Sequence, residues 1–273
     1  MSKAKAKSIL KSGVGLSILT LFSRVLGLVR EMVKSRFLGT TPLADAFTVS
    51  FLVPNLLRRL FAENSMTVAF IPTFKALIDK NDADAKKNEI KEFLSSIFTI
   101  ITFFTTIIVA VSIISTPYIL QFLFPRLEDR DSAILLTRIM FPYLIFISLA
   151  AFFQGILNGV KIFAPTGFTP ILFNLSVILC TYLLGKTFGN AAKAMSFGVV
   201  LGGALQALFQ LPYVLRNRFY FSFCSLHRAF LNENTRKTLR LIAPTIVGMA
   251  AYQINDLVST SLATAYGTGI ASS

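Results

Sequence analysis

The sequence predicts an all-α protein, a polytopic transmembrane bundle of about seven helices. Composition is the first reason: 54% of the 273 residues are hydrophobic and 15% are charged, whereas soluble domains carry roughly 25% charged residues. The mean hydropathy of +0.66 is the second. The third is the length of the uncharged runs. Residues 93–118 contain no Asp, Glu, Lys or Arg, and a run of this length crosses a hydrocarbon core of roughly 30 Å.

Seven apolar spans can be drawn, each ended by a glycine, a proline or a charged cluster. The second is too long for one straight helix, and Pro54 and Pro72 predict a bend or break in it. The acidic and lysine-rich segment 79–92 is expected to be a solvated cytoplasmic helix or loop. The predicted spans are 12–36, 44–78, 93–118, 133–159, 164–186, 194–215 and 240–266.

The distribution of Lys and Arg predicts the orientation. With a cytoplasmic N-terminus, the inside segments hold 16 of these residues and the outside segments hold 6, as the positive-inside rule requires. Lysines before the apolar stretch 13–22 resemble a signal peptide, but no A-x-A cleavage site follows. We therefore expect an uncleaved first helix.

A net charge of +14 raises nucleic acid as a partner. The basic residues lie between the apolar runs, however, so we expect no nucleic-acid binding. Cys180 and Cys224 are expected to be free thiols. His227 has no companions at ligand spacing, and the sequence lacks a phosphate-binding loop or a nucleophile elbow. We therefore expect a transporter rather than an enzyme, with no metal and no cofactor.

Ionisable residues inside the spans are the strongest functional signal, because each costs roughly 2.5–3.5 kcal/mol at the centre of a transmembrane helix. Arg59 and Glu63 are four residues apart on the second span, so we expect a structural ion pair. Arg58 points about 100° away from Arg59 and has no such partner at i+4.

Arginine outnumbers acid in the first two spans, and guanidinium groups suit a diphosphate better than a carboxylate or a cation. One hypothesis is therefore an anion cavity formed by Arg24, Arg30 and Arg58. The alternative is that these arginines snorkel to the interface, balanced by acids that include Glu31, Asp45 and Glu63, with Glu31 available to pair with Arg24.

Asp256 is the only acid inside the last span. It is a candidate for ion coupling, since intramembrane acids often serve that role. The competing interpretation is a buried acid that is hydrogen-bonded to Asn255 or to a neighbouring helix.

Several stretches resemble the MurJ/MviN family of lipid II flippases, which serve bacterial peptidoglycan synthesis. The similarity extends over essentially the whole chain through matches that include Gly155, Asn158, Pro170, Asn174 and Pro212. The stretches that carry it best are 22–31 (FSRVLGLVRE), 44–47 (ADAF), 54–63 (PNLLRRLFAE), 69–72 (AFIP) and 141–143 (FPY).

The resemblance implies a transporter of the multidrug/oligosaccharidyl-lipid/polysaccharide exporter superfamily, with two helical lobes around a cationic cavity. Arg24, Arg30, Asp45 and Arg58 match the family's cavity residues, which hold the lipid II diphosphate during alternating access. The expected substrate is the undecaprenyl-diphosphate-linked peptidoglycan precursor. Alternatives are an exporter of another lipid-linked oligosaccharide, a cation-coupled small-molecule exporter, and a membrane scaffold that transports nothing.

Family members have about fourteen helices, so this chain would hold residues 1–237 as the six-helix N-terminal lobe. Residues 238–273 would supply the first helix of an apparently truncated C-terminal lobe. The family also implies a multi-pass protein of the cytoplasmic (inner) membrane that contacts membrane lipids, with cell-wall synthesis proteins as candidate partners.

Overall fold

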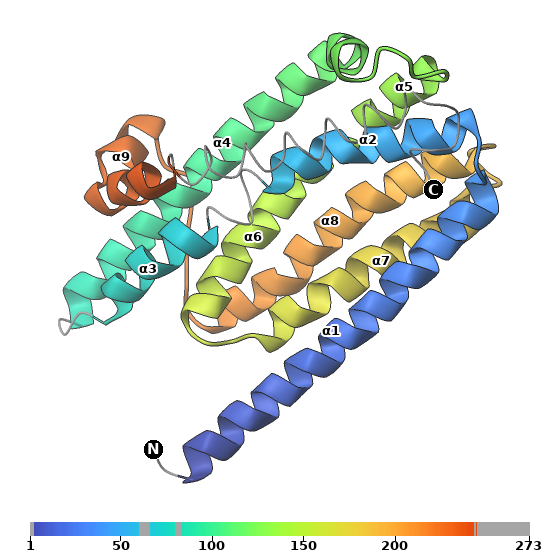
Figure 1. The fold of residues 1–273 in the computed structure, drawn as a ribbon. Helices are drawn as coiled ribbons and strands as arrows, with labels where there is room; N and C mark the ends of the chain where they lie inside the picture. Colours follow the sequence, from blue (N-terminus) through green and yellow to red (C-terminus); the bar gives the residue numbers. More distant parts are fainter. Residues whose placement is uncertain (1–2, 60–65, 80–82, 243, 245–273) are drawn as a thin grey trace.

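The computed structural model describes residues 3–59, 66–79, 83–242 and 244, and this part of the chain contains helices and no strands (Figure 1). The all-α class predicted from the sequence is confirmed. The elements in chain order are α1 (Lys3–Leu38), α2 (Pro42–Arg58), the π-helix η2 (Met66–Phe70), α3 (Ile71–Ile78), α4 (Ala83–Leu123), α5 (Arg130–Met140), α6 (Tyr143–Gly159), α7 (Ala164–Leu184), α8 (Ala191–Arg216) and α9 (Leu226–Leu231).

Four helical segments of the described residues are long and apolar enough to cross a membrane: Lys86–Leu123, Arg130–Gly159, Ala164–Leu184 and Ala191–Arg216. They correspond to the predicted third, fourth, fifth and sixth spans. The predicted first span, 12–36, lies within α1. The predicted span 240–266 lies almost entirely outside the described residues.

Two predicted spans correspond to more than one described element. The second corresponds to α2, η2 and α3, and residues 60–65 lie outside the described residues. α2 continues as one helix past Pro54, whereas Pro72 lies in the first turn of α3, where the π-helix η2 passes into an α-helix. The fourth is divided at Phe141 and Pro142 into α5 and α6, because a proline cannot donate the backbone hydrogen bond that would continue the helix.

Glycines allow α8 to pack closely on α7. Gly198 and Gly202 are four residues apart, and a Cβ at Gly198 would stand only 2.8 Å from Val177 Cα. At Gly202, the added Cβ would stand 3.2 Å from Phe173 Cα. Small residues at this spacing bring transmembrane helices into backbone contact, where van der Waals packing replaces the hydrophobic effect.

An aromatic cluster joins η2, α3, α4 and α6. The ring of Phe70 lies 5.4 Å from Phe74, 5.5 Å from Phe93 and 5.7 Å from Phe152, measured between centroids. All four side chains are fully buried. Phe219, which follows α8, also packs its ring on Phe74. The cluster therefore connects the segment after α8 to α3.

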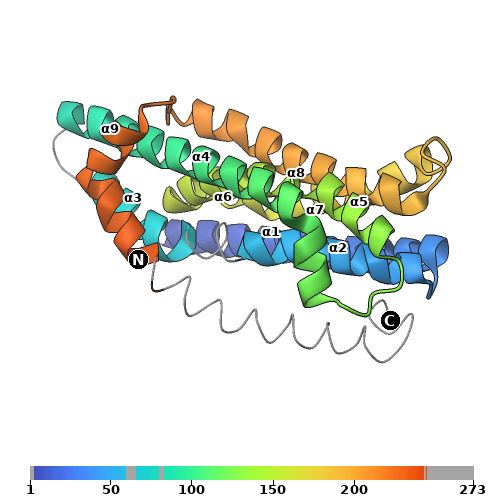
Figure 2. The ribbon, with the colours of Figure 1, turned by 90° about the horizontal axis from the view of Figure 1, so that it is seen from above.

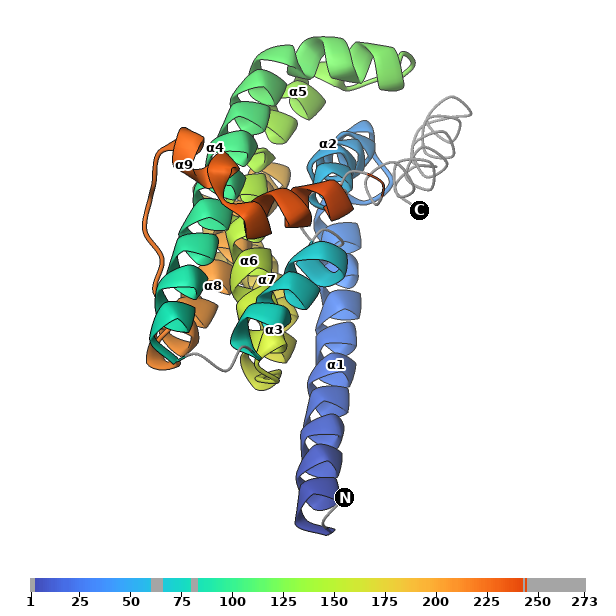
Figure 3. The same cartoon turned by 90° about the vertical axis from the view of Figure 1, so that its left-hand side faces the viewer.

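The helices run side by side and form an elongated bundle (Figure 2). α7 packs on both α8 and α1, while α2 packs on α5. Figure 3 shows the N-terminal part of α1 extending past the ends of α6, α7 and α8. α1 contacts α7 from Leu16 and Leu19 onward, where both lie against Gly167, and the C-terminal half of α1 carries the candidate site.

Candidate functional site

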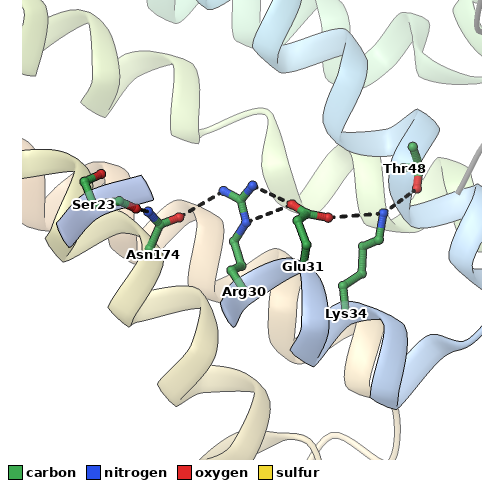
Figure 4. A network of polar contacts seen from close by, with 6 residues as sticks. All are labelled: Ser23, Arg30, Glu31, Lys34, Thr48 and Asn174. Carbon is green, nitrogen blue, oxygen red and sulfur yellow. Dashed lines mark hydrogen bonds and ion pairs between the residues drawn. The ribbon is translucent and has the colours of Figure 1, made fainter. Parts of the chain in front are cut away.

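A continuous line of polar contacts connects α7, α1 and α2, with Arg30 at its centre (Figure 4). Arg30 Nη2 and Nε both donate to Glu31 Oε1, at 2.6 and 3.2 Å. Arg30 Nη1 donates to Asn174 Oδ1 at 3.2 Å, and Asn174 Nδ2 donates to the Ser23 carbonyl, also at 3.2 Å. The backbone of α1 thus fixes the direction in which the Asn174 amide faces, and the amide in turn holds the guanidinium.

Arg30 keeps capacity for a further ligand. Within the described residues it uses three of the five N–H donors that a guanidinium offers. Its Cζ lies 5.7 Å from the centre of the Phe173 ring, which is within cation–π distance. The charge is therefore held in place by an acid, an amide and a ring, and two N–H groups remain for an anion.

Lys34 extends the polar line toward α2. Its Nζ lies 3.5 Å from Glu31 Oε2 and donates to Thr48 Oγ1 at 3.4 Å. The Glu31 carboxylate therefore bridges two cations, one through each oxygen. The hydrogen bond from Lys34 Nζ to Thr48 Oγ1 therefore connects α1 to α2 beside the site.

A cavity of about 420 Å³ lies beside Arg30, within the range of ligand pockets. Two arginines, neutral amides, hydroxyls and aromatic rings line it, so its lining carries positive charge together with many hydrogen-bonding groups. The lining residues are Arg30, Phe51, Asn55, Arg58, Tyr143, Ile147, Ala150, Ala151, Gln154, Thr166, Thr169, Pro170, Phe173 and Gln206. A smaller cavity of about 210 Å³, lined in part by Glu31, Lys34 and Thr48, shares Arg30, Phe51 and Phe173 with it.

Arg58 lines the larger cavity from the end of α2. Its partner lies on the preceding turn: Arg58 Nε donates to Asn55 Oδ1, three residues earlier, at 2.8 Å. This bond orients Arg58 toward the same cavity that Arg30 lines from α1. Two of the three predicted arginines therefore meet at one site.

The other predicted residues are placed differently. Arg24 is exposed on α1 and is not among the residues that line the larger cavity. α1 continues as one helix past Gly27, and Glu31 pairs with Arg30 and Lys34 rather than with Arg24. Asp45 is buried in α2, also outside that lining. Arg59 follows α2, whereas its expected partner Glu63 and the candidate ion site Asp256 lie outside the described residues.

Sequence reasoning missed the neutral polar residues of the site. It searched the spans for ionisable groups, and so assigned no role to Asn55, Gln154, Asn174 or Gln206. The available signal was an amide within an apolar run, since polar groups inside a membrane helix also need partners. Which amide faces which arginine depends on the packing of α7 on α1, which a linear pattern does not contain.

The sequence profile described as "Lipid II flippase MurJ" matches residues 34–273, which is most of the chain. The chain belongs to the MurJ family. A protein of Treponema pallidum named "Probable lipid II flippase MurJ" is 50% identical over 270 residues, covering 97% of this chain and 50% of the relative. A protein of Vibrio cholerae with the same name is 32% identical over 271 residues, covering 97% and 51%.

A solved structure of a MurJ protein gives the same assignment. "Lipid II flippase MurJ, inward closed conformation" superposes with a TM-score of 0.74 at 26% identity, covering 93% of this chain and 51% of that one. The Vibrio cholerae MATE transporter VcmN in its bent form has a TM-score of 0.66 at 14% identity, covering 98% and 60%, and shows a shared fold alone. The MurJ relatives are named as flippases, which are transporters. The chain spans about half the length of the curated relatives it matches.

Proposed function

We propose that the protein serves as a lipid II flippase of the cytoplasmic membrane, with its N-terminus inside the cell. It would carry the undecaprenyl-diphosphate-linked peptidoglycan precursor from the cytoplasmic leaflet to the outer leaflet by alternating access. The observation that carries the proposal is the cavity of about 420 Å³ in which Arg30 and Arg58 converge from two helices. Membership of the MurJ family supports the same substrate.

The two arginines would hold the diphosphate, because charge-assisted hydrogen bonds from guanidinium to phosphate are strong and can be bidentate. Arg24 and Asp45 would join the site in another state of the transport cycle. The neutral amides and hydroxyls of the lining would face the disaccharide, whose hydroxyl and acetamido groups are uncharged hydrogen-bonding partners.

The test is the affinity of the purified chain for undecaprenyl diphosphate and for lipid II in detergent. Arg30→Ala and Arg58→Ala are each expected to weaken binding about ten- to hundredfold, since a hydrogen bond to a charged group contributes about 1.5–3 kcal/mol. Arg36→Ala is the matched control, because Arg36 is an exposed arginine on the same helix as Arg30 and lies outside both cavities. Unchanged affinity in both cavity variants would contradict the proposal.

The second candidate is a cation-coupled small-molecule exporter of the same superfamily, which the fold shared with a MATE transporter favours. An exporter of this kind would depend on acids rather than on arginines. Loss of transport in Asp45→Asn or Asp256→Asn, with transport retained in Arg30→Ala and Arg58→Ala, would favour this candidate. An exporter of another lipid-linked oligosaccharide would instead bind undecaprenyl diphosphate but discriminate against lipid II.

A further inference from the structure

A third cavity lies between α4 and the segment 222–232. It shares no lining residue with the cavity of about 420 Å³ that Arg30 and Arg58 line, which we name the arginine cavity. Its volume is about 760 Å³, and α9 lies beside α4 there (Figure 1). We name it the α4–α9 cavity. Its lining residues are Asn88, Lys91, Glu92, Ser95, Ser96, Ser222, Phe223, Cys224, Arg228, Leu231 and Asn232.

The cavity is built by hydrogen bonds between α4 and the chain that follows α8. Ser222 N donates to Ser95 Oγ at 3.1 Å, and Cys224 N donates to Thr99 Oγ1 at 3.0 Å. Ser95 and Thr99 are one helical turn apart, so they face the same side of α4 and receive alternate amides of an extended segment. The wall of the cavity is therefore fixed, and its polar groups hold defined positions.

The lining carries positive charge and hydrogen-bond donors. Lys91 and Arg228 face one acid, Glu92, so the charged groups of the lining sum to +1. Neither cation belongs to the ion pairs found among the described residues. Ser96 is 4% exposed and makes no side-chain hydrogen bond within the described part of the chain, although it lines the cavity. A hydroxyl that lines a cavity and has no internal partner is available to a ligand there.

The cavity lies at the depth of the membrane surface. Lys91 and Glu92 immediately precede the uncharged run that begins at Phe93, so they mark the boundary between water and hydrocarbon on α4. Phe223 and Leu231, which also line the cavity, are 68% and 55% exposed. A cationic pocket with an apolar rim at this depth matches an amphiphile with an anionic head.

We propose that the α4–α9 cavity binds a phosphate group through Lys91, Arg228 and the Ser96 hydroxyl. The apolar rim favours the phosphodiester of an acidic phospholipid as its source. Basic groups at the cytoplasmic surface attract anionic lipids, and the hydroxyl adds a donor for a phosphate oxygen. This site is separate from the arginine cavity, and its test requires no lipid II.

The chain contains no tryptophan, so Phe223→Trp introduces a single reporter on the rim. The reporter protein is placed in bilayers of phosphatidylcholine that contain either brominated phosphatidylglycerol or brominated phosphatidylcholine at equal mole fraction. We expect brominated phosphatidylglycerol to quench the reporter at roughly one fifth of the mole fraction needed for brominated phosphatidylcholine. A third sample contains phosphatidylcholine alone and is titrated with inorganic phosphate.

Two variants of the reporter protein separate a built site from general surface charge. Lys91→Gln with Arg228→Gln should abolish the preference for phosphatidylglycerol. Lys87→Gln with Lys237→Gln, which removes the same charge from exposed positions outside the cavity, should leave the preference intact. Ser96→Ala alters no charge and should lower the preference by roughly half or more, which provides a second test if the double variant fails to fold.

A phosphate-dependent change of the reporter in phosphatidylcholine that needs Lys91 and Arg228 would also support the site, and would make free phosphate the source. Equal quenching by the two brominated lipids, with no response to inorganic phosphate, would overturn the proposal. An equal loss of preference in the control pair would overturn it as well, because ordinary surface charge would then explain the binding.

Discussion

At the scale of single residues, Glu31 lies between two cations, Arg30 and Lys34, and its contact with Lys34 affects how strongly it holds Arg30. One carboxylate oxygen contacts Arg30 at 2.6 Å, and the other lies 3.5 Å from Lys34. An anion that binds Arg30 must compete with Glu31 for the same guanidinium. Lys34 offers Glu31 a second cation during that competition, and Thr48 holds Lys34 from α2. Lys34 is thus a positioning residue for the proposed diphosphate site.

Lys34→Met is therefore expected to weaken undecaprenyl diphosphate binding about three- to tenfold, because Glu31 would then neutralise Arg30 alone. Adding Glu31→Gln should restore the affinity, a coupling in the range of about 0.5–3 kcal/mol found for residues in contact. The measurement is a double-mutant cycle on the dissociation constant. Lys75→Met, at an exposed lysine on α3, serves as the control. No rescue by Glu31→Gln would mean that Lys34 contacts the ligand directly.

At single residues, only part of the candidate site could be predicted from the sequence. Arg30 and Arg58 could be selected because charge inside a span is costly, and the structure places both at one cavity. The sequence could not predict two hydrogen bonds of the site, one between Arg58 and Asn55 and the other between Arg30 and Asn174. The first depends on the side-chain conformation at the end of α2, and the second joins residues 144 positions apart.

At the scale of helices, the sequence predicts the ends of a helix well where a glycine, a proline or a capping residue ends the apolar run. The predicted spans 164–186 and 194–215 lie close to α7 and α8, and Asn190 caps α8 by accepting from Ala192 N and Lys193 N. α4 is longer than predicted, since it begins at Ala83 and includes most of the charged segment 79–92. Lys and Glu, which form most of the charged residues at the start of α4, are good helix formers. The change from charged to apolar residues there marks the membrane boundary and not the end of the helix.

The α7–α8 contact gives a stability prediction. Gly198→Ala should lower the midpoint of thermal unfolding in detergent, because the new Cβ would meet Val177 Cα at 2.8 Å and overpacking costs about 1–3 kcal/mol. Gly15→Ala is the matched control, since a Cβ on Gly15 has nothing within 4 Å.

A thiol-reactive dye reports the unfolding in a Cys224→Ser background, where the buried Cys180 becomes reactive only when α7 and α8 separate. The Gly15 variant should unfold at the wild-type temperature or slightly above it, because alanine favours helix over glycine. An equal shift in both variants would show that the close approach of α7 and α8 adds nothing to stability.

At the scale of the whole molecule, the proposed orientation can be read along α4. This helix has 41 residues and rises about 1.5 Å per residue, so its ends lie farther apart than the roughly 30 Å of a hydrocarbon core. Lys87 lies near its first turn, and Arg126 lies just beyond its last one. Both side chains are exposed. With a cytoplasmic N-terminus, these two positions face opposite sides of the membrane.

In a background of Cys180→Ser and Cys224→Ser, Arg126→Cys should therefore react with a membrane-impermeant maleimide in intact cells, as a residue on the outer side does. Lys87→Cys should react only after the membrane is permeabilised. Labelling with a permeant maleimide controls for exposure, because both thiols should then react at similar rates. The reverse pattern would place the N-terminus outside, and the α4–α9 cavity, at the Lys87 end of α4, would then meet the lipids of the outer leaflet instead of the acidic cytoplasmic surface.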